Sequence, residues 1–322
     1  MLTEHDVPPT RDVRLQDGVP TRSIPYGRDG RLAVTEWGDP YGTPVFFFHG
    51  TPGCRVGPLP KTSFLFRHRI RLICYDRPGY GRSTRREKRA VSDGADQVRT
   101  IADRLGIERF AVVGRSGGGP HALACAALLR ERVTKAATLV TLAPPDEGPD
   151  GMGRRWYDDM APSNIKEYEA ASQGTRYFTE FLEPRAQDIR EKPTSLIRGF
   201  FHELPQSDRR IVMNAVVRKS LTQGYEIALK SSFGGWVDDA VAFRNPWGFD
   251  LALISAPVRL WHGADDIFSP VSHTGWLAEK IRGAEPLIQP GVGHFSAIYA
   301  LPSLLTWLTA GASSFARPAY CG

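Results

Sequence analysis

A serine stands at the centre of a glycine-rich turn between a short apolar run and a stretch of helix-forming residues. The turn, GRSGG at residues 114–118, follows the apolar run FAVV at residues 110–113. The run predicts a buried strand, and residues 121–129 predict a helix. A sharp bend between strand and helix needs small neighbours, because the two elements approach closely. The pattern therefore predicts a strand–turn–helix that exposes the hydroxyl of Ser116 at the bend.

Other short apolar runs bounded by turns predict further strands. They lie at residues 31–37, 45–48, 72–75, 135–142, 258–261 and 286–288. We expect a helix over residues 93–105 with Ser92 as its N-cap, and a last helix over 301–308. Residues 1 to about 30 are polar and rich in turn residues, so they form a weakly specified lead-in. Strands that alternate with helices predict an α/β fold, with a mostly parallel sheet covered by helices on both faces.

The segment from residue 146 to 245 has a different pattern. Its apolar residues have helical spacing, aromatic residues are frequent and strand-like runs are scarce. We therefore expect a helical insertion over one edge of the sheet, with residues 1–145 and 246–322 forming the core. Aromatic side chains of this insertion could form an apolar wall of a substrate pocket. The residues predicted to contact substrate are Trp156, Tyr157, Phe178, Phe181 and Trp236.

Composition narrows the classes of partner. The net charge is +6, but the basic residues are dispersed apart from one cluster at residues 82–89, which we interpret as a solvated loop. No nucleic-acid motif accompanies this cluster. The four cysteines show no metal-site spacing and no disulfide pattern, which favours a reducing cytoplasm. The N-terminal residues lack the pattern of a signal peptide, and we expect no membrane insertion.

A serine needs a base to take its proton and an acid to orient that base. His294 closes a glycine-flexible loop, GVGH, directly after the last predicted strand. The preceding strand leads into the loop GADD, where Asp265 and Asp266 compete for the role of the acid, and we favour Asp266. The order serine, acid, histidine, with each residue after a predicted strand, is typical of one hydrolase architecture. We interpret His121 and His262 as structural.

A hydrolase of this kind also needs N–H donors for the negatively charged oxygen of its intermediate. One donor should be the backbone N–H of Gly117, which directly follows the serine. The second should come from the loop HGTPG at residues 49–53. Pro52 has no N–H, which leaves Thr51 as the favoured donor and Gly53 as the alternative. His49 is interpreted as a buried hydrogen-bonding strut.

Together these motifs, with YDRPGYGRS at residues 75–83, resemble the α/β-hydrolase superfamily, and they span almost the whole chain beyond the lead-in. The resemblance implies an eight-stranded, mostly parallel sheet with a helical cap at residues 146–245. Its usual acid, three residues after Gly263 and four before Pro270, corresponds to Asp266. The chain is similar to the esterase-like and prolyl-aminopeptidase-like branches, but it departs from the peptidase pattern at Thr51 and Gly117. Because a serine holds the nucleophile position, dehalogenase and epoxide hydrolase chemistry is disfavoured.

The leading hypothesis is a serine hydrolase of small or medium carboxylic esters, lactones or thioesters. It would act through Ser116, His294 and Asp266, without a metal or organic cofactor. A second hypothesis is an aminopeptidase, which would need carboxylates facing the pocket; the available residues are Asp158, Asp159, Glu180 and Glu183. A third is non-hydrolytic work on the same fold, such as acyl transfer or cyclisation. The sequence leaves the substrate and the oligomeric state open.

Overall fold

One sheet runs through the protein. The computed structural model describes residues 13–16, 18–145 and 152–311 of the 322-residue chain. Within them the strand order is β1-β2-β3-β5-β4-β6-β7-β8-β9. The strands are β1 Val13–Gln16, β2 Val19–Tyr26, β3 Gly30–Gly38, β4 Thr43–Phe48, β5 Ile70–Tyr75, β6 Phe110–Arg115, β7 Val133–Leu139, β8 Val258–Gly263 and β9 Glu285–Gln289. The predicted α/β class with a mostly parallel sheet is confirmed.

The sheet has one strand more than the expected eight. The run from β5 to β9 is parallel, whereas β1, β2 and β3 form an antiparallel extension that joins β5. Both β1 and β2 lie in the segment that we interpreted as a weakly specified lead-in. That interpretation is wrong for β2, because backbone pairing to β3 holds this strand although only Thr21, Ile24 and Tyr26 of it are buried.

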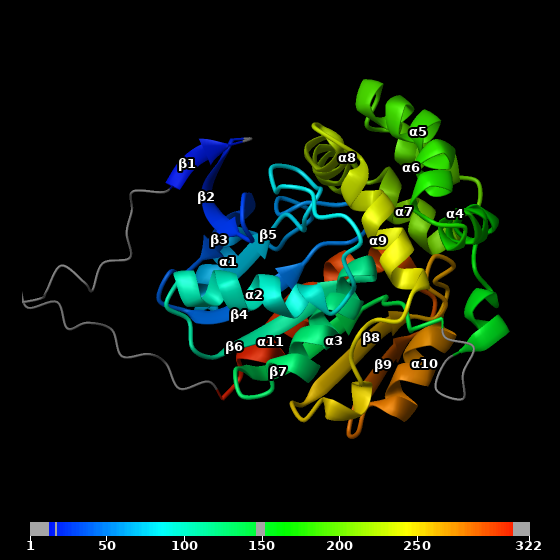
Figure 1. Cartoon of the computed structure of the whole chain (residues 1–322). Helices are drawn as coiled ribbons and strands as arrows, with labels where there is room; N and C mark the ends of the chain where they lie inside the picture. Colours follow the sequence, from blue (N-terminus) through cyan, green and yellow to red (C-terminus); the bar gives the residue numbers. More distant parts are fainter. Residues whose placement is uncertain (1–12, 17, 146–151, 312–322) are drawn as a thin grey trace, which may run out of the picture.

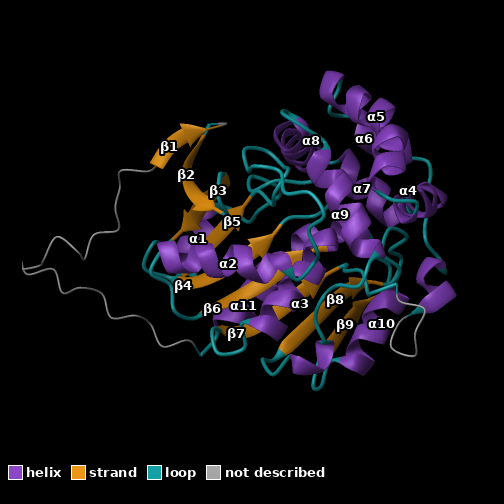
Figure 2. Ribbon diagram, viewed as in Figure 1, coloured by secondary structure: helices purple, strands orange, loops and turns teal. Residues whose placement is uncertain are grey.

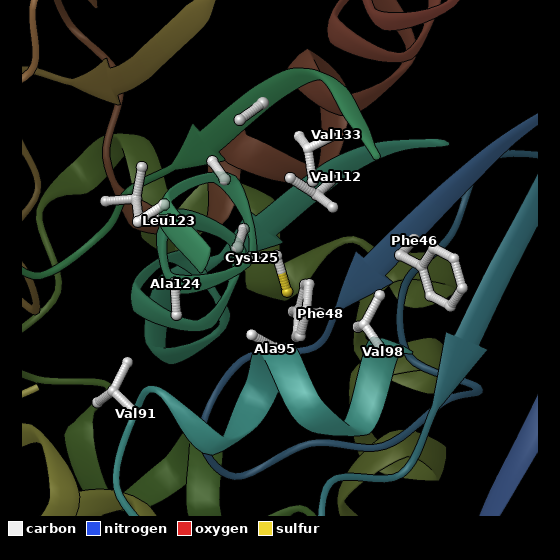
Figure 3. Packing of buried hydrophobic residues seen from close by; sticks show 14 of the residues in the cluster. Phe46, Phe48, Val91, Ala95, Val98, Val112, Leu123, Ala124, Cys125 and Val133 are labelled. Carbon is white, nitrogen blue, oxygen red and sulfur yellow. The ribbon is translucent and has the colours of Figure 1, made fainter. Parts of the chain in front are cut away.

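Helices cover both faces of the sheet (Figure 2). On one face lie α2 (Asp93–Arg104), α3 (Gly119–Leu128) and α10 (Val271–Lys280), and on the other lie α1 (Thr62–Arg67) and α11 (Ala297–Thr309). Successive side chains of β4 alternate between the two resulting cores, as side chains of a strand must. Figure 3 shows Phe46 and Phe48 on the side of α2, whereas Phe47 packs toward α11.

Between β7 and β8 the described chain is helical. These helices gather beyond one end of the sheet (Figure 1) and share a hydrophobic core of their own. They are α4 Pro162–Ser172, α5 Thr175–Glu191, α6 Ser195–Phe200, α7 Gln206–Met213, α8 Ala215–Leu229 and α9 Gly234–Arg244. The division into a core and a cap domain remains a prediction. In the part of the chain described here, no helix combines the length and apolarity of a bilayer-spanning segment.

Some local expectations are wrong. Ser92 directly precedes α2, but its side chain makes no capping hydrogen bond to the helix. The seventh strand ends at Leu139 instead of residue 142, because Val140 turns the backbone into the left-handed region with φ +48°. Cys54, Cys74 and Cys125 are buried free thiols, and Cys321 lies outside the described residues.

The two ends of α3 offer a matched test of this packing. Leu123 is fully buried against the sheet, whereas Leu128 on the same helix is 44% exposed. We expect Leu123→Ala to lower the free energy of unfolding by about 2–5 kcal/mol, because it leaves a cavity in a close-packed core. Leu128→Ala should cost less than about 1 kcal/mol. Urea denaturation of both variants checks this, and equal losses would contradict the packing described for α3.

Candidate active site

The turn after β6 carries Ser116 in a strained backbone conformation. Its φ is +53°, a region that residues with a side chain adopt at a cost. The neighbouring glycines are required by close approach. A Cβ on Gly114 would lie 2.2 Å from the carbonyl oxygen of Gly118, and one on Gly118 would lie 2.3 Å from that of Phe48. Small residues therefore allow strand, turn and α3 to meet, which is the steric requirement predicted from the sequence.

The predicted base and acid are in contact. His294 follows β9 and Asp266 follows β8, so the parallel sheet brings their loops together. The Nδ1 atom of His294 lies 2.8 Å from Oδ2 of Asp266. Asp265, the competing acid, is exposed and its Oδ2 lies 3.4 Å from the hydroxyl of Ser207. The geometry therefore pairs His294 with Asp266.

The surroundings of Asp266 keep its carboxylate ionised. The other oxygen, Oδ1, accepts hydrogen bonds from the N–H groups of Phe268 (2.8 Å) and Ser269 (3.2 Å). Burial raises the pKa of Asp266, but the charges and hydrogen bonds of His294 and His262 outweigh burial and bring it below its usual range. An ionised carboxylate only accepts, so Nδ1 of His294 donates to it. This bond fixes the tautomer and orients the ring.

Ser116 and His294 line one cavity together with both predicted donors, Thr51 and Gly117. The cavity opens to solvent and lies between the core and the helices that follow β7. Thr51 and Gly117 adjoin each other, since a Cβ on Gly117 would lie 2.3 Å from Oγ1 of Thr51. Four of the five predicted catalytic and donor residues therefore line the same cavity. The fifth, Asp266, lies behind His294 and contacts its ring.

A buried ion cluster supports the loop that carries Thr51. Asp239 of α9 accepts a hydrogen bond from the hydroxyl of Thr51 at 2.7 Å, and it pairs with Arg77 at 2.5 Å and Arg89 at 2.6 Å. Arg77 also donates to the carbonyl oxygens of His49 and Gly50. Burial raises the pKa of Asp239, but the two guanidinium groups outweigh it and hold the pKa well below its usual range. A helix between β7 and β8 thus fixes the loop after β4.

His49 is a strut in this loop, as predicted. Its Nε2 accepts the N–H of Arg77 at 3.1 Å, so its Nδ1 donates to the carbonyl oxygen of Gly50 at 2.8 Å. Burial and the charge of Arg77 lower the pKa of His49 well below the ordinary value, so the ring stays neutral.

Another helix between β7 and β8 holds the loop of His294. Asp208 of α7 is fully buried, and its two oxygens accept the N–H groups of His294 and Phe295, each at 2.8 Å. Burial raises the pKa of Asp208 to about 6, although the neighbouring His294 and these hydrogen bonds oppose the shift. Sequence reasoning missed Asp208, because its partners are backbone groups far along the chain.

Comparison with known proteins identifies the family to which this fold belongs. A family model described as the alpha/beta hydrolase fold matches residues 43–301. The chain belongs to the α/β-hydrolase fold family.

The relatives of this α/β-hydrolase include esterases and haloperoxidases. It is 26% identical over 273 residues to the bifunctional esterase/perhydrolase DCH of Acinetobacter calcoaceticus, which covers 80% of this chain and 87% of that protein. A bromoperoxidase structure from Bacillus anthracis matches with a TM-score of 0.68 and 19% identity, covering 89% of this chain and 99% of that chain. A Thermogutta terrifontis esterase structure matches with a TM-score of 0.63 and 20% identity, covering 90% and 99%. The curated relatives support hydrolase activity, and the two structures show the shared fold.

Of the five predicted substrate contacts, Trp236 lines the cavity of this hydrolase. Trp156 and Phe178 are fully buried in hydrophobic cores, and Tyr157 packs on Trp156. Phe181 is 43% exposed, next to Phe178 on α5. These four residues do not line the cavity. The prediction was wrong for them because helical spacing shows that a helix face is buried but not which part of the protein it contacts.

Other residues of the cavity wall were missed by sequence reasoning. Glu167 of α4 lines the cavity, pairs with Arg185 at 3.0 Å and accepts from the indole N–H of Trp236 at 2.6 Å. Further lining residues are Asn164, Tyr168, Leu196, Phe200, Tyr225, Phe268 and Phe295. No sequence motif marks them, since they lie on separate helices and loops.

The cluster at residues 82–89 is only partly the solvated loop that we expected. Arg82, Arg86 and Lys88 are exposed, but Arg89 is buried against Asp239 and Arg85 is half-buried against Asp238. The interpretation is therefore wrong for Arg89, whose carboxylate partner lies about 150 residues away in the sequence.

Neighbouring acids on α9 test the ion cluster. We expect Asp239→Asn to lower the free energy of unfolding by about 3–5 kcal/mol, because it leaves Arg77 and Arg89 buried beside a neutral amide. The control Asp238→Asn should cost less, since its partner Arg85 is 32% exposed and can reach water. Urea denaturation measures both. Equal destabilisation by the two substitutions would contradict the prediction that the ion pairs of Asp239 stabilise the protein more than that of Asp238.

Proposed function

We propose that this α/β-hydrolase cleaves a carboxylic ester, lactone or thioester of a small or medium molecule through Ser116, His294 and Asp266. One observation carries the proposal. Ser116 and His294 line the same cavity, while the far side of the His294 ring contacts the ionised carboxylate of Asp266. A neutral imidazole held in this way has its Nε2 atom available as a base.

In the proposed reaction, Nε2 of His294 takes the proton of the Ser116 hydroxyl as the oxygen attacks the carbonyl carbon. Asp266 stabilises the imidazolium that forms. The backbone N–H groups of Thr51 and Gly117 bind the oxyanion of the tetrahedral intermediate. The imidazolium then gives its proton to the leaving alcohol, and an acyl-enzyme remains. Water, activated by His294, hydrolyses this ester and restores the serine. The route needs no metal or organic cofactor.

We further propose that residues 146–245 act as a cap that selects the substrate. In the described part, the cap supplies the cavity wall opposite the serine through residues such as Glu167, Phe200 and Tyr225. Its acids Asp239 and Asp208 hold the loops of Thr51 and His294. The cap would therefore shape the pocket and also align the catalytic groups.

An aminopeptidase has less support than an esterase. The four acids predicted to bind a substrate amine, Asp158, Asp159, Glu180 and Glu183, are exposed and do not line the cavity. The acid that does line it, Glu167, is neutralised by Arg185. Acyl transfer would use the same catalytic groups, and product analysis with an added alcohol acceptor separates it from hydrolysis.

Replacement of the nucleophile tests the proposal. We expect the protein to hydrolyse short p-nitrophenyl esters and to react covalently with a fluorophosphonate probe. Ser116→Ala should abolish labelling and lower kcat by several orders of magnitude, about 10⁶-fold in a well-studied serine hydrolase. Intact-protein mass spectrometry and initial rates measure the two effects. Labelling that persists in Ser116→Ala would overturn the assignment.

The adjacent aspartates test the acid. Asp266→Asn should lower kcat by up to about 10⁴-fold, because an amide neither fixes the tautomer of His294 nor stabilises its charged form. Asp265→Asn is the matched control, and its rate should stay within a few-fold of the unmodified protein, since Asp265 is exposed. A larger loss in Asp265→Asn than in Asp266→Asn would contradict the pairing.

A further inference from the structure

Arg115, the residue before the nucleophile, is a buried cation without a carboxylate partner. It is 9% exposed, and its Nη1 atom is buried with no hydrogen-bond acceptor. No acid among the described residues lies within ion-pair distance of it. Three other buried arginines differ in this respect, because Arg55, Arg77 and Arg89 each pair with a buried aspartate.

An uncompensated buried charge is costly to the folded protein. Burial lowers the pKa of Arg115, and the Tyr225 phenol is the group that opposes this shift. A phenol that keeps its proton supplies no full negative charge. The guanidinium therefore lacks a counter-ion within the described protein, and an anion from outside would relieve this cost.

The position of Arg115 directs it toward the substrate. It lines the main cavity beside Ser116, and it also lines a smaller adjoining pocket. A Cβ built on Gly50 would lie 3.5 Å from Cβ of Ser116 and 3.5 Å from Nη2 of Arg115. Both side chains therefore border the same space next to Gly50, so a ligand bound at the serine would lie close to the guanidinium.

The charge balance of the cavity favours a monovalent anion. Apart from Arg115, the residues with full charges that line it are Glu167 and Arg185, which pair with each other at 3.0 Å. Arg115 is therefore the cation of this wall whose charge no lining carboxylate balances. A carboxylate matches this charge, whereas a phosphate dianion would bring one negative charge in excess.

We infer that Arg115 binds a carboxylate of the substrate, so that the preferred substrates are short esters that also carry a free carboxylate, such as half-esters of dicarboxylic acids. The inference rests on the proposed ester hydrolysis. The planar guanidinium donates two parallel hydrogen bonds to the carboxylate, which positions the ester carbonyl at Ser116. Arg115 is thus a specificity-determining residue.

The test compares monomethyl adipate with methyl hexanoate, two esters of similar length of which the first carries a carboxylate. We expect a higher kcat/KM for monomethyl adipate, measured by methanol release. Arg115→Met should lower the ratio of the two kcat/KM values by about tenfold to a hundredfold, as for loss of a charge-assisted hydrogen bond. Arg115→Lys should retain part of the ratio. The control Arg176→Met, on an arginine whose side chain is 94% exposed, should keep the ratio.

A second measurement separates binding from turnover. In the Ser116→Ala background, calorimetry should show that Arg115→Met weakens binding of monomethyl adipate by a similar factor. An unchanged ratio in Arg115→Met, or equal losses for both esters, would overturn the inference, because a purely structural role lowers both rates alike. Failure of the ester hydrolysis itself is distinguishable, because the unmodified protein would then release methanol from neither ester.

Discussion

The carboxylate of Asp239 is the contact on which the rest of the active site depends. From α9 it reaches the hydroxyl of Thr51 and the fully buried guanidinium groups of Arg77 and Arg89. The contact joins the helices between β7 and β8 to the loops after β4 and β5. Because an unpaired charge in this place would be costly, the three groups hold one another in a single arrangement. This arrangement fixes the position of the loop at residues 49–53, which carries Thr51.

Two further buried contacts extend this support. Asp76 and Arg77 are consecutive, yet Asp76 pairs with Arg55 at 2.6 Å while Arg77 turns to Asp239. One dipeptide after β5 thus fixes two parts of the neighbouring loop. On the other side of the cavity, Asp208 binds the backbone of His294. The groups proposed to act on the substrate are therefore held by partners behind them, which is what precise positioning requires.

The sequence predicts those parts of the molecule whose causes are local. Apolar runs indicate the buried strands, and close approach at Gly114 explains the turn at Ser116. Chain order after strands identifies Asp266 and His294, because the carboxyl ends of parallel strands converge. The cavity wall is different. Helical spacing shows that Trp156 and Phe178 are buried, but their neighbours depend on helix packing that no spacing encodes. The burial of Arg89 likewise depends on an aspartate about 150 residues further along the chain.

Helices α4, α5, α6, α8 and α9 line the cavity, and Asp208 of α7 and Asp239 of α9 bind the loops of His294 and Thr51. If these helices swung away as a rigid lid, Arg77 and Arg89 would lose their counter-ion in the same movement that opened the cavity. Such a hinge movement would therefore leave two buried guanidinium groups unpaired, and this cost opposes it. Rotations of side chains that line the cavity would leave these ion pairs intact. Phe200 of α6 and Phe268 are two such side chains, and their rings meet edge to face at 5.0 Å. Access to the cavity through rotamer changes of aromatic rings would thus be compatible with a permanently paired ion cluster.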